Sequence, residues 1–130
     1  MDIIEIRTRA KEEFVDLTAE VGRVVAASGV ASGVCVVAVP HTTAGVTVNE
    51  NADPDVRADL LMTLRRIVPD ALPYAHAEGN SPAHVKAALV GSSATLLVEG
   101  GRLQLGTWQG VFFCEFDGPR TRKVWVKVIG

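Results

Sequence analysis

The last third of the chain alternates apolar and polar residues with a period of two, and this pattern constrains the fold most. From Ser92 onward the chain contains ATLLVE, RLQLG, WQGVFFCEF and VWVKVI. Side chains of a strand point alternately to the two faces of a sheet, so these runs predict strands. The Gly100-Gly101 pair and the DGPR sequence at 117–120 predict tight turns between them. The C-terminal third is therefore expected to be a series of antiparallel strands.

Helix-start signals dominate the middle of the chain. Asp53 can cap free amide groups and Pro54 is tolerated in a first turn, which predicts a helix whose apolar face ends before Pro69. Ser81 with Pro82 repeats this combination. It predicts a shorter helix that ends at Gly91 and carries His84 in its first turn.

The N-terminal part allows two interpretations. Residues 3–6 predict a short strand, and residues 13–18 predict either a second strand or part of one long helix. We favour the strand, followed by a helix capped by Thr18 and ended by Gly29. The continuously apolar run 34–39, VCVVAV, predicts a central strand that is covered on both faces.

Length and composition are typical of one folded domain spanning residues 1–130. Of its 130 residues, 48% are hydrophobic and 22% charged, which excludes a disordered chain. Strands that bracket helices indicate an α+β fold, with helices packed on a mixed, largely antiparallel β-sheet in a single compact domain. Cys35 and Cys114 lie in apolar runs without a CxxC spacing and are interpreted as buried packing residues.

The charge balance bears on partners and location. A net charge of -2 gives no electrostatic reason to expect nucleic acid or an anionic membrane as a partner. The N-terminus lacks the apolar core of a signal peptide, and no run is long enough to span a bilayer. We therefore expect a cytoplasmic protein with no nucleic-acid and no membrane partner.

The first candidate site segment is HTTAGVTVNENADPD at residues 41–55. It follows the apolar strand and places His41, Thr42, Thr43, Asn49 and Asp53 before the second helix, where polar side chains can converge. A purely structural explanation is open for several of them, since threonine forms strands and aspartate caps helices. A histidine at the exit of an apolar strand has no such explanation.

The second candidate segment is HAEGNSPAH at residues 76–84. The start of the helix that carries His84 can receive an anion, and Asn80 and Ser81 add hydrogen-bond donors beside it. The spacing of His76 and His84 is not a zinc signature, because HExxH and paired-cysteine motifs are absent. A metal site formed by the three histidines would have to be assembled by the fold.

The third candidate segment is GTWQGVFFCEFDGPRTR at residues 106–122. Asp117, Arg120, Arg122 and Lys123 surround the predicted turn, which can be a solvated turn with exposed ion pairs. Alternatively, if the sheet brings Trp108 and Gln109 of a neighbouring strand towards the other two segments, the arginines Arg120 and Arg122 could bind a phosphate group bidentately.

Together, these three segments resemble the motifs of the YjbQ-like family, described as secondary thiamine-phosphate synthases. The similarity runs over nearly the whole chain. The resemblance implies a homotrimer with its site near subunit boundaries. It also implies a divalent metal, zinc, on His41, His76 and His84, with magnesium as the alternative for a diphosphate substrate.

The resemblance further implies an activity. The family can condense a hydroxymethylpyrimidine diphosphate with a thiazole phosphate, as a weak or secondary transferase reaction. In this hypothesis Asn49, Asp53 and His84 are catalytic. The substrate, a small phosphorylated heterocycle, is bound by the hydroxyl, amide and guanidinium groups of Thr42, Thr43, Asn80, Ser81, Gln109 and Arg120.

Two other interpretations remain open from the sequence. The same residues could form a metal- or phosphometabolite-binding trimer without turnover, or the polar segments could seal subunit contacts. An assembly role explains the helix caps but not three histidines clustered with Asn49 and Glu78. We rank the enzyme first and the binding protein second.

Overall fold

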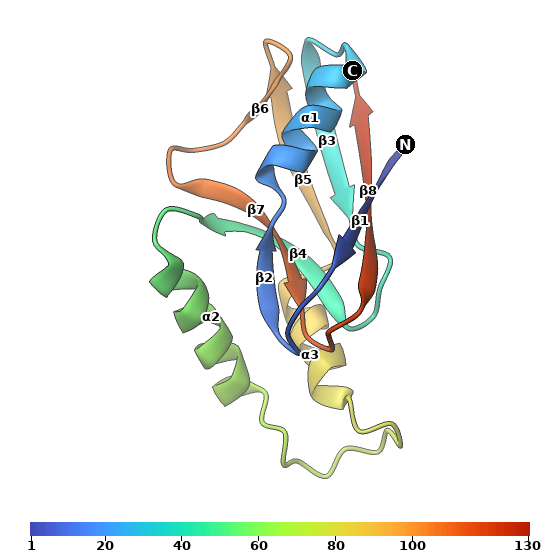
Figure 1. The fold of residues 1–130 in the computed structure, drawn as a ribbon, viewed down its shortest axis with the longest axis vertical. Coiled ribbons are helices and arrows are strands. Elements are labelled where there is room, and N and C mark those ends of the chain that lie inside the picture. The colour runs from blue at the N-terminus through green and yellow to red at the C-terminus, as the bar shows by residue number, and fades with distance from the viewer.

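The computed structural model describes residues 1–130, which form two antiparallel sheets and three helices (Figure 1). In chain order the elements are β1 (Asp2–Arg7), β2 (Glu13–Asp16), α1 (Thr18–Ser28), β3 (Ser32–Ala38), β4 (Ala44–Glu50), α2 (Pro54–Ile67), α3 (Ser81–Val90), β5 (Ser93–Glu99), β6 (Arg102–Gln104), β7 (Gln109–Glu115) and β8 (Thr121–Ile129). The larger sheet has the order β1-β8-β3-β5-β6, and the smaller has the order β2-β7-β4.

The α+β class is confirmed. Every strand pairing is antiparallel, so the parallel part of the expected mixed sheet is absent. The Gly100-Gly101 turn joins β5 to β6 with both residues at positive φ, 58° and 73°, a conformation in which glycine has no steric cost.

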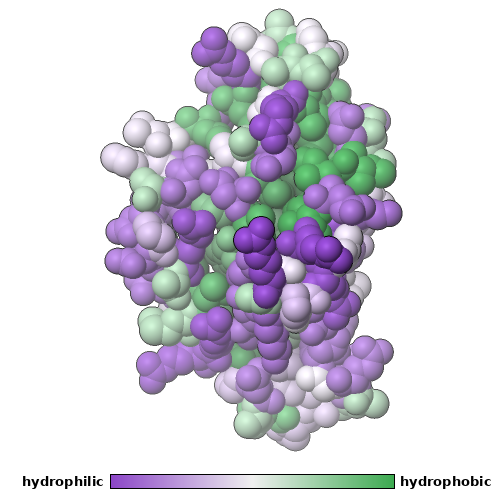
Figure 2. All heavy atoms as spheres, viewed as in Figure 1, coloured by the Kyte–Doolittle hydropathy of each residue, from purple (hydrophilic) through white to green (hydrophobic).

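The main hydrophobic core lies between α1 and the strands that it covers. Leu17, Val21 and Val25 pack there against inward residues of β3, β5 and β8, such as Val37, Val98 and Val126. On the face seen in Figure 2, hydrophobic residues gather beside α1 at the right, whereas hydrophilic residues cover much of the lower part.

Strand β7 belongs to two cores, because both of its faces are covered. Val111 and Phe113 point into the main core, whereas Phe112 and Cys114 point into a second core that includes α3 residues and is flanked by leucines of α2. This explains why residues 111–114 are continuously apolar.

The strand at 34–39 was predicted to be covered on both faces, but within the chain only one of its faces is covered. β3 is central, lying between β8 and β5, and Cys35 and Val37 are fully buried. Val34 and Val36 point to the opposite face, which no helix covers, and both are only partly buried. Hydrophobic residues therefore reach the surface on that side.

The strand interpretation of residues 13–16 is confirmed, and α1 ends at Gly29 in the left-handed conformation as predicted. Thr18, however, is the first helical residue, and Leu17 occupies the N-cap position. The Thr18 hydroxyl instead donates to Asp16 Oδ1 at 2.6 Å and accepts from the amide of Val111 at 3.0 Å, joining α1 to β7.

The two proline-marked helices form where expected. Asp53 caps α2 by accepting from the amide of Asp55 at 2.9 Å. At α3 the N-cap is Asn80, with no side-chain capping bond, and Ser81 is the first helical residue rather than the cap. None of the three helices is long and apolar enough to cross a membrane.

Candidate functional site

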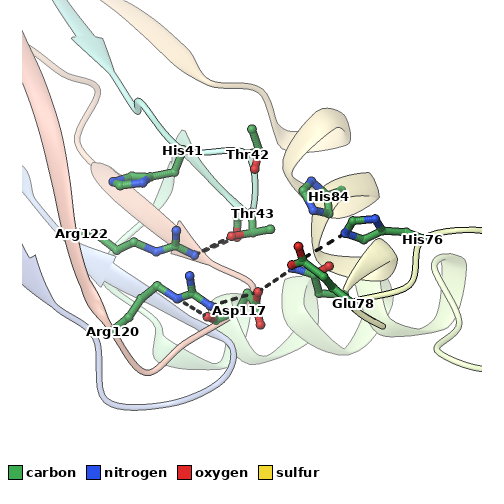
Figure 3. A pocket seen from close by; sticks show the side chains of 10 residues that line it. His41, Thr42, Thr43, His76, Glu78, His84, Asp117, Arg120 and Arg122 are labelled. Carbon is green, nitrogen blue, oxygen red and sulfur yellow. Dashed lines mark hydrogen bonds and ion pairs between the residues drawn. The ribbon is translucent and has the colours of Figure 1, made fainter.

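A polar pocket of about 620 Å³ opens where the β3–β4 connection, the β7–β8 turn and α3 meet (Figure 3). No hydrophobic residue lines it. Its lining residues are His41, Thr42, Thr43, His76, Glu78, Asn80, His84, Asp117, Arg120 and Arg122. Three segments that are far apart in the sequence, including all three histidines, therefore form one site.

A buried ion pair forms the floor of this pocket. Arg122 on β8 is 3% exposed and Glu115 on β7 is fully buried. Arg122 Nε donates to Glu115 Oε2 at 2.8 Å, and Arg122 Nη2 donates to Glu115 Oε1 and to the Thr43 hydroxyl, the latter at 2.8 Å. Burial alone would raise the pKa of Glu115, but hydrogen bonds led by that from Arg122 hold the pKa below 4.5.

Thr8 ties the end of β1 to this floor. Its hydroxyl contacts Glu115 Oε2 at 2.9 Å and accepts from the amide of Arg120 at 2.9 Å. The turn that carries Arg120 passes so close that a Cβ on Gly118 would lie 2.3 Å from the carbonyl oxygen of Ala10. Glycine is required there for the turn to reach the pocket.

His41 continues the hydrogen bonding of β8 beyond the end of β3. The β3–β8 ladder ends at Ala38 and Trp125, and the next free amide, that of Lys123, donates to His41 Nε2 at 2.9 Å. Burial lowers the pKa of His41 below 6.5, and the positive charge of Arg122 lowers it further. His41 is therefore held as a neutral imidazole at neutral pH.

His76 and His84 form a separate pair on the opposite wall. Their ring centroids lie 5.4 Å apart in an edge-to-face arrangement, and His76 Nε2 lies 3.8 Å from Glu78 Oε2. Figure 3 shows this pair beside α3, across the pocket from Arg120 and Arg122.

Asn80 and Asp117 connect α3 to the β7–β8 turn. Asn80 Nδ2 donates to Asp117 Oδ2 at 3.0 Å, and Arg120 donates to the Asp117 carbonyl at 2.8 Å and to its carboxylate at 3.2 Å. Asn80 Oδ1 is the one buried side-chain oxygen or nitrogen without a partner.

The predicted zinc site of three histidines is wrong. No group of three or more histidine, cysteine, aspartate or glutamate side chains is placed to hold a metal ion. His76 and His84 lie together, but His41 is on the other wall with Nε2 already engaged by Lys123. His76, His84 and Glu78 have the donor types of an open catalytic zinc site, but they are not placed around one ion either.

Some of the other predicted site residues lie at the pocket and some do not. Thr42, Thr43, Asn80 and Arg120 line the pocket, and Ser81 lines an adjoining cavity with Tyr74, His76, His84 and Val85.

Asn49, Asp53 and Gln109 do not line the pocket. β4 starts beside it at Ala44 and runs roughly 20 Å to Glu50, so Asn49 and Asp53 lie at its far end. Gln109 pairs with Glu50 there, and its side chain accepts from the amide of Gly106. These three residues are therefore separated from His84, with which the sequence hypothesis had grouped them.

Four residues at the pocket had no role in the hypothesis based on the family resemblance: Glu78, Asp117 and Arg122 line the pocket, and Glu115 lies buried beneath it. A signal existed for two of them. Arg122 is in phase with the inward-facing Val124 and Val126, and Glu115 lies in the apolar run of β7. A charged residue at a core position predicts a buried pair.

Similar proteins are known from other organisms. The UPF0047 protein YugU of Bacillus subtilis is 48% identical over 128 residues, covering 98% of this chain and 97% of YugU. A UPF0047 protein of Methanocaldococcus jannaschii is 49% identical over 126 residues, covering 97% and 91%. A crystal structure of an uncharacterized YjbQ/UPF0047 family protein from Clostridium acetobutylicum superposes with a TM-score of 0.97 at 52% identity, covering 99% of this chain and all of that one.

These comparisons correct the functional expectation. The relatives are known only as UPF0047 proteins, and a similar structure from Sulfolobus solfataricus, with a TM-score of 0.96 and 32% identity over 99% of this chain and 95% of that one, is described as a protein of unknown function. Nothing in them indicates thiamine-phosphate synthase or other transferase activity, or metal binding. The prediction of a metal-binding thiamine-phosphate synthase is therefore wrong.

The family resemblance itself is confirmed. The model of the family described as UPF0047 protein YjbQ-like matches residues 2–130. This match covers both sheets, all three helices and the complete pocket. The chain belongs to the YjbQ-like UPF0047 family.

Proposed function

We propose that the pocket binds a small polar ligand through an oxyanion group, a carboxylate or a phosphate. The observation that carries this proposal is the hydrogen bonding of Arg122. Its Nε and Nη2 donate to Glu115 and Thr43. Nη1 has no partner in the chain and is not among the buried atoms, and Arg122 lines the pocket. A rigidly held guanidinium with one free edge is suited to binding an oxyanion.

Neighbouring donors support the same conclusion. Arg120 is 51% exposed and is held by Asp117 through Nε and Nη2 only, so that Nη1 has no partner there either. Thr42 adds a hydroxyl to the lining. The two arginines lie on the side of the pocket near β8, and Thr42 lies above them, towards α3 (Figure 3).

The carboxylates limit how much negative charge the ligand can carry. Glu78, Asp117 and the adjoining Glu115 oppose only two guanidinium groups, those of Arg120 and Arg122. These carboxylate and guanidinium groups together carry one net negative charge, so the site suits a single oxyanion on a polar molecule better than a polyanion.

Replacement of Arg120 tests the proposal. Arg120→Gln is expected to weaken binding of inorganic phosphate or acetate at least about tenfold, because a charged hydrogen bond is lost. The control is Arg102→Gln, which changes an exposed arginine on β6 outside the pocket and leaves affinity unchanged. Affinities are measured by titration followed in NMR spectra. Failure of both probes to bind at millimolar concentration, or equal affinities for the two variants, contradicts the proposal.

For the homotrimer we propose an interface on the uncovered face of the larger sheet. Leu97 is 62% exposed, Trp125 is 40% exposed, and Ile3 and Ile129 are also exposed. The strand register sets Ile3 beside Trp125 and places Val34 between Ile129 and Leu97. Val36 lies between these two apolar groups, with Lys127 and Thr95 on either side of it. Monomers rarely expose such groups, and a second sheet could pack on this face.

A charged substitution tests this interface. The wild-type chain is expected to have a mass near three times 13.8 kDa by light scattering after gel filtration. Leu97→Lys should dissociate it, because a lysine would be buried without a partner. Met62→Lys, at an exposed hydrophobic site on α2 outside this sheet, is the control. A monomeric wild type, or a Leu97→Lys variant that keeps the wild-type mass, overturns the interface.

A further inference from the structure

We propose that His41 is a fixed, neutral hydrogen-bond donor that binds the oxyanion group through Nδ1–H, together with Nη1 of Arg122. This inference rests on the proposed function and names the two donors that recognise the ligand. His41 is thereby a specificity-determining residue, not a metal ligand.

The first step is the tautomer. A neutral imidazole has one protonated and one unprotonated nitrogen. His41 Nε2 accepts the hydrogen of the Lys123 amide at 2.9 Å, so Nε2 must be the unprotonated nitrogen. The proton is therefore on Nδ1. Because the Lys123 amide belongs to a sheet strand, the orientation of the ring is fixed by the fold.

The second step is the availability of Nδ1. No group in the chain hydrogen-bonds to it, and it is not among the buried atoms without a partner. Figure 3 shows the His41 ring above the side chain of Arg122, on the same wall of the pocket. Arg122 Nη1 is also unpartnered. Two donors without a partner in the chain thus lie on the same wall of the pocket.

The third step is the charge state. Burial and the positive charge of Arg122 disfavour the imidazolium of His41 more than the carboxylate of Glu115 favours it, and the amide hydrogen of Lys123 leaves no room for a proton on Nε2. A neutral donor beside a guanidinium that is already neutralised by Glu115 adds no charge to the site. Such a pair recognises the position of an acceptor oxygen, as preorganised donors do in oxyanion-binding sites.

NMR of the free protein tests the tautomer without any ligand. In ¹⁵N-labelled protein at pH 7.5, long-range ¹H–¹⁵N spectra are expected to show His41 with a protonated Nδ1 and an unprotonated Nε2. The opposite tautomer, or a doubly protonated ring, overturns the inference even if phosphate binds normally.

Two amide variants separate the two nitrogens of the ring. The glutamine side-chain amide reaches the position of Nε2 and can still accept from Lys123, whereas that of asparagine reaches the position of Nδ1 and can donate to the ligand. His41→Gln is expected to keep the wild-type melting temperature and to bind inorganic phosphate about fivefold more weakly. His41→Asn is expected to melt earlier and to bind with nearly wild-type affinity.

The measured affinities and the tautomer distinguish a failure of the donor role from a failure of the proposed function. Equal affinities of His41→Gln and the wild type, or equally weakened affinities of both variants, overturn the donor role. A wild-type protein with the expected tautomer that binds neither phosphate nor acetate overturns the proposed function, and the donor role with it. The wrong tautomer with normal binding overturns only the role of His41.

Discussion

Glu115→Ala is expected to lower the free energy of unfolding by about 3–5 kcal/mol, because it leaves a buried guanidinium without its counter-ion. Arg122 is 3% exposed and donates to both carboxylate oxygens of Glu115. The amide of Asp117 and the hydroxyl of Thr8 lose the same acceptor. Urea unfolding at pH 7.5 measures the change.

Two controls make this result specific. Glu20→Ala removes the exposed ion pair with Arg23 and should cost less than about 1 kcal/mol. Glu115→Leu combined with Arg122→Met should recover most of the loss, since apolar residues can replace a buried pair. If Glu115→Ala costs no more than Glu20→Ala, the buried network does not stabilise the fold as described.

The same residue has a predicted pH signature. The pKa of Glu115 is below 4.5 in the folded chain, so its stabilisation is complete above about pH 4.5 and is lost as the pH falls through the folded-state pKa. Glu115→Ala should therefore have a flatter decline of stability in acid than the wild type. A decline as steep as that of the wild type would assign the acid sensitivity to other groups.

Glu12→Ala is expected to cost about 3 kcal/mol, since it removes the partner of a second buried cation. Glu12 accepts from Lys86 Nζ at 2.7 Å and from Arg65 Nε at 2.7 Å, and so joins the β1–β2 connection to α3 and α2. The Lys86 side chain is only 4% exposed. Chemical denaturation measures the loss.

Arg65→Ala is the matched control for Glu12. The Arg65 side chain is 53% exposed, so its removal should cost less than about 1 kcal/mol and leave Lys86 paired. Equal losses for Arg65→Ala and Glu12→Ala would show that the exposed contact, not the buried lysine, carries the stabilisation.

Local sequence signals predicted most of the elements. The caps and turns depend on residues close in the chain, so Asp53-Pro54, Gly29 and Gly100-Gly101 lie where the sequence placed them. Thr18 departs from its predicted role for a tertiary reason, since its hydroxyl binds a strand amide 93 residues away. No local pattern encodes such a contact.

In the site, too, the local sequence signals were predictive and the tertiary contacts were not. The sequence predicted three polar segments, around His41, around His76 and His84, and around Arg120, and all three meet in the pocket. Asn49 and Asp53 are close to Thr43 in the sequence but not in space, because the whole length of β4 separates them from it. The zinc prediction is wrong because the imidazole of His41 is turned towards the Lys123 amide. The spacing of histidines in the sequence does not encode this orientation.

The double role of β7 limits how this protein can vary. Each of the residues 111–114 is fully buried, and successive side chains enter different cores. A larger or smaller side chain in place of Phe113 would disturb the packing beneath α1, and one in place of Phe112 would disturb the packing beneath α2 and α3. Homologues that change β7 are therefore expected to carry compensating changes in the layer that the altered side chain enters, so substitutions along this strand should co-vary in two alternating sets.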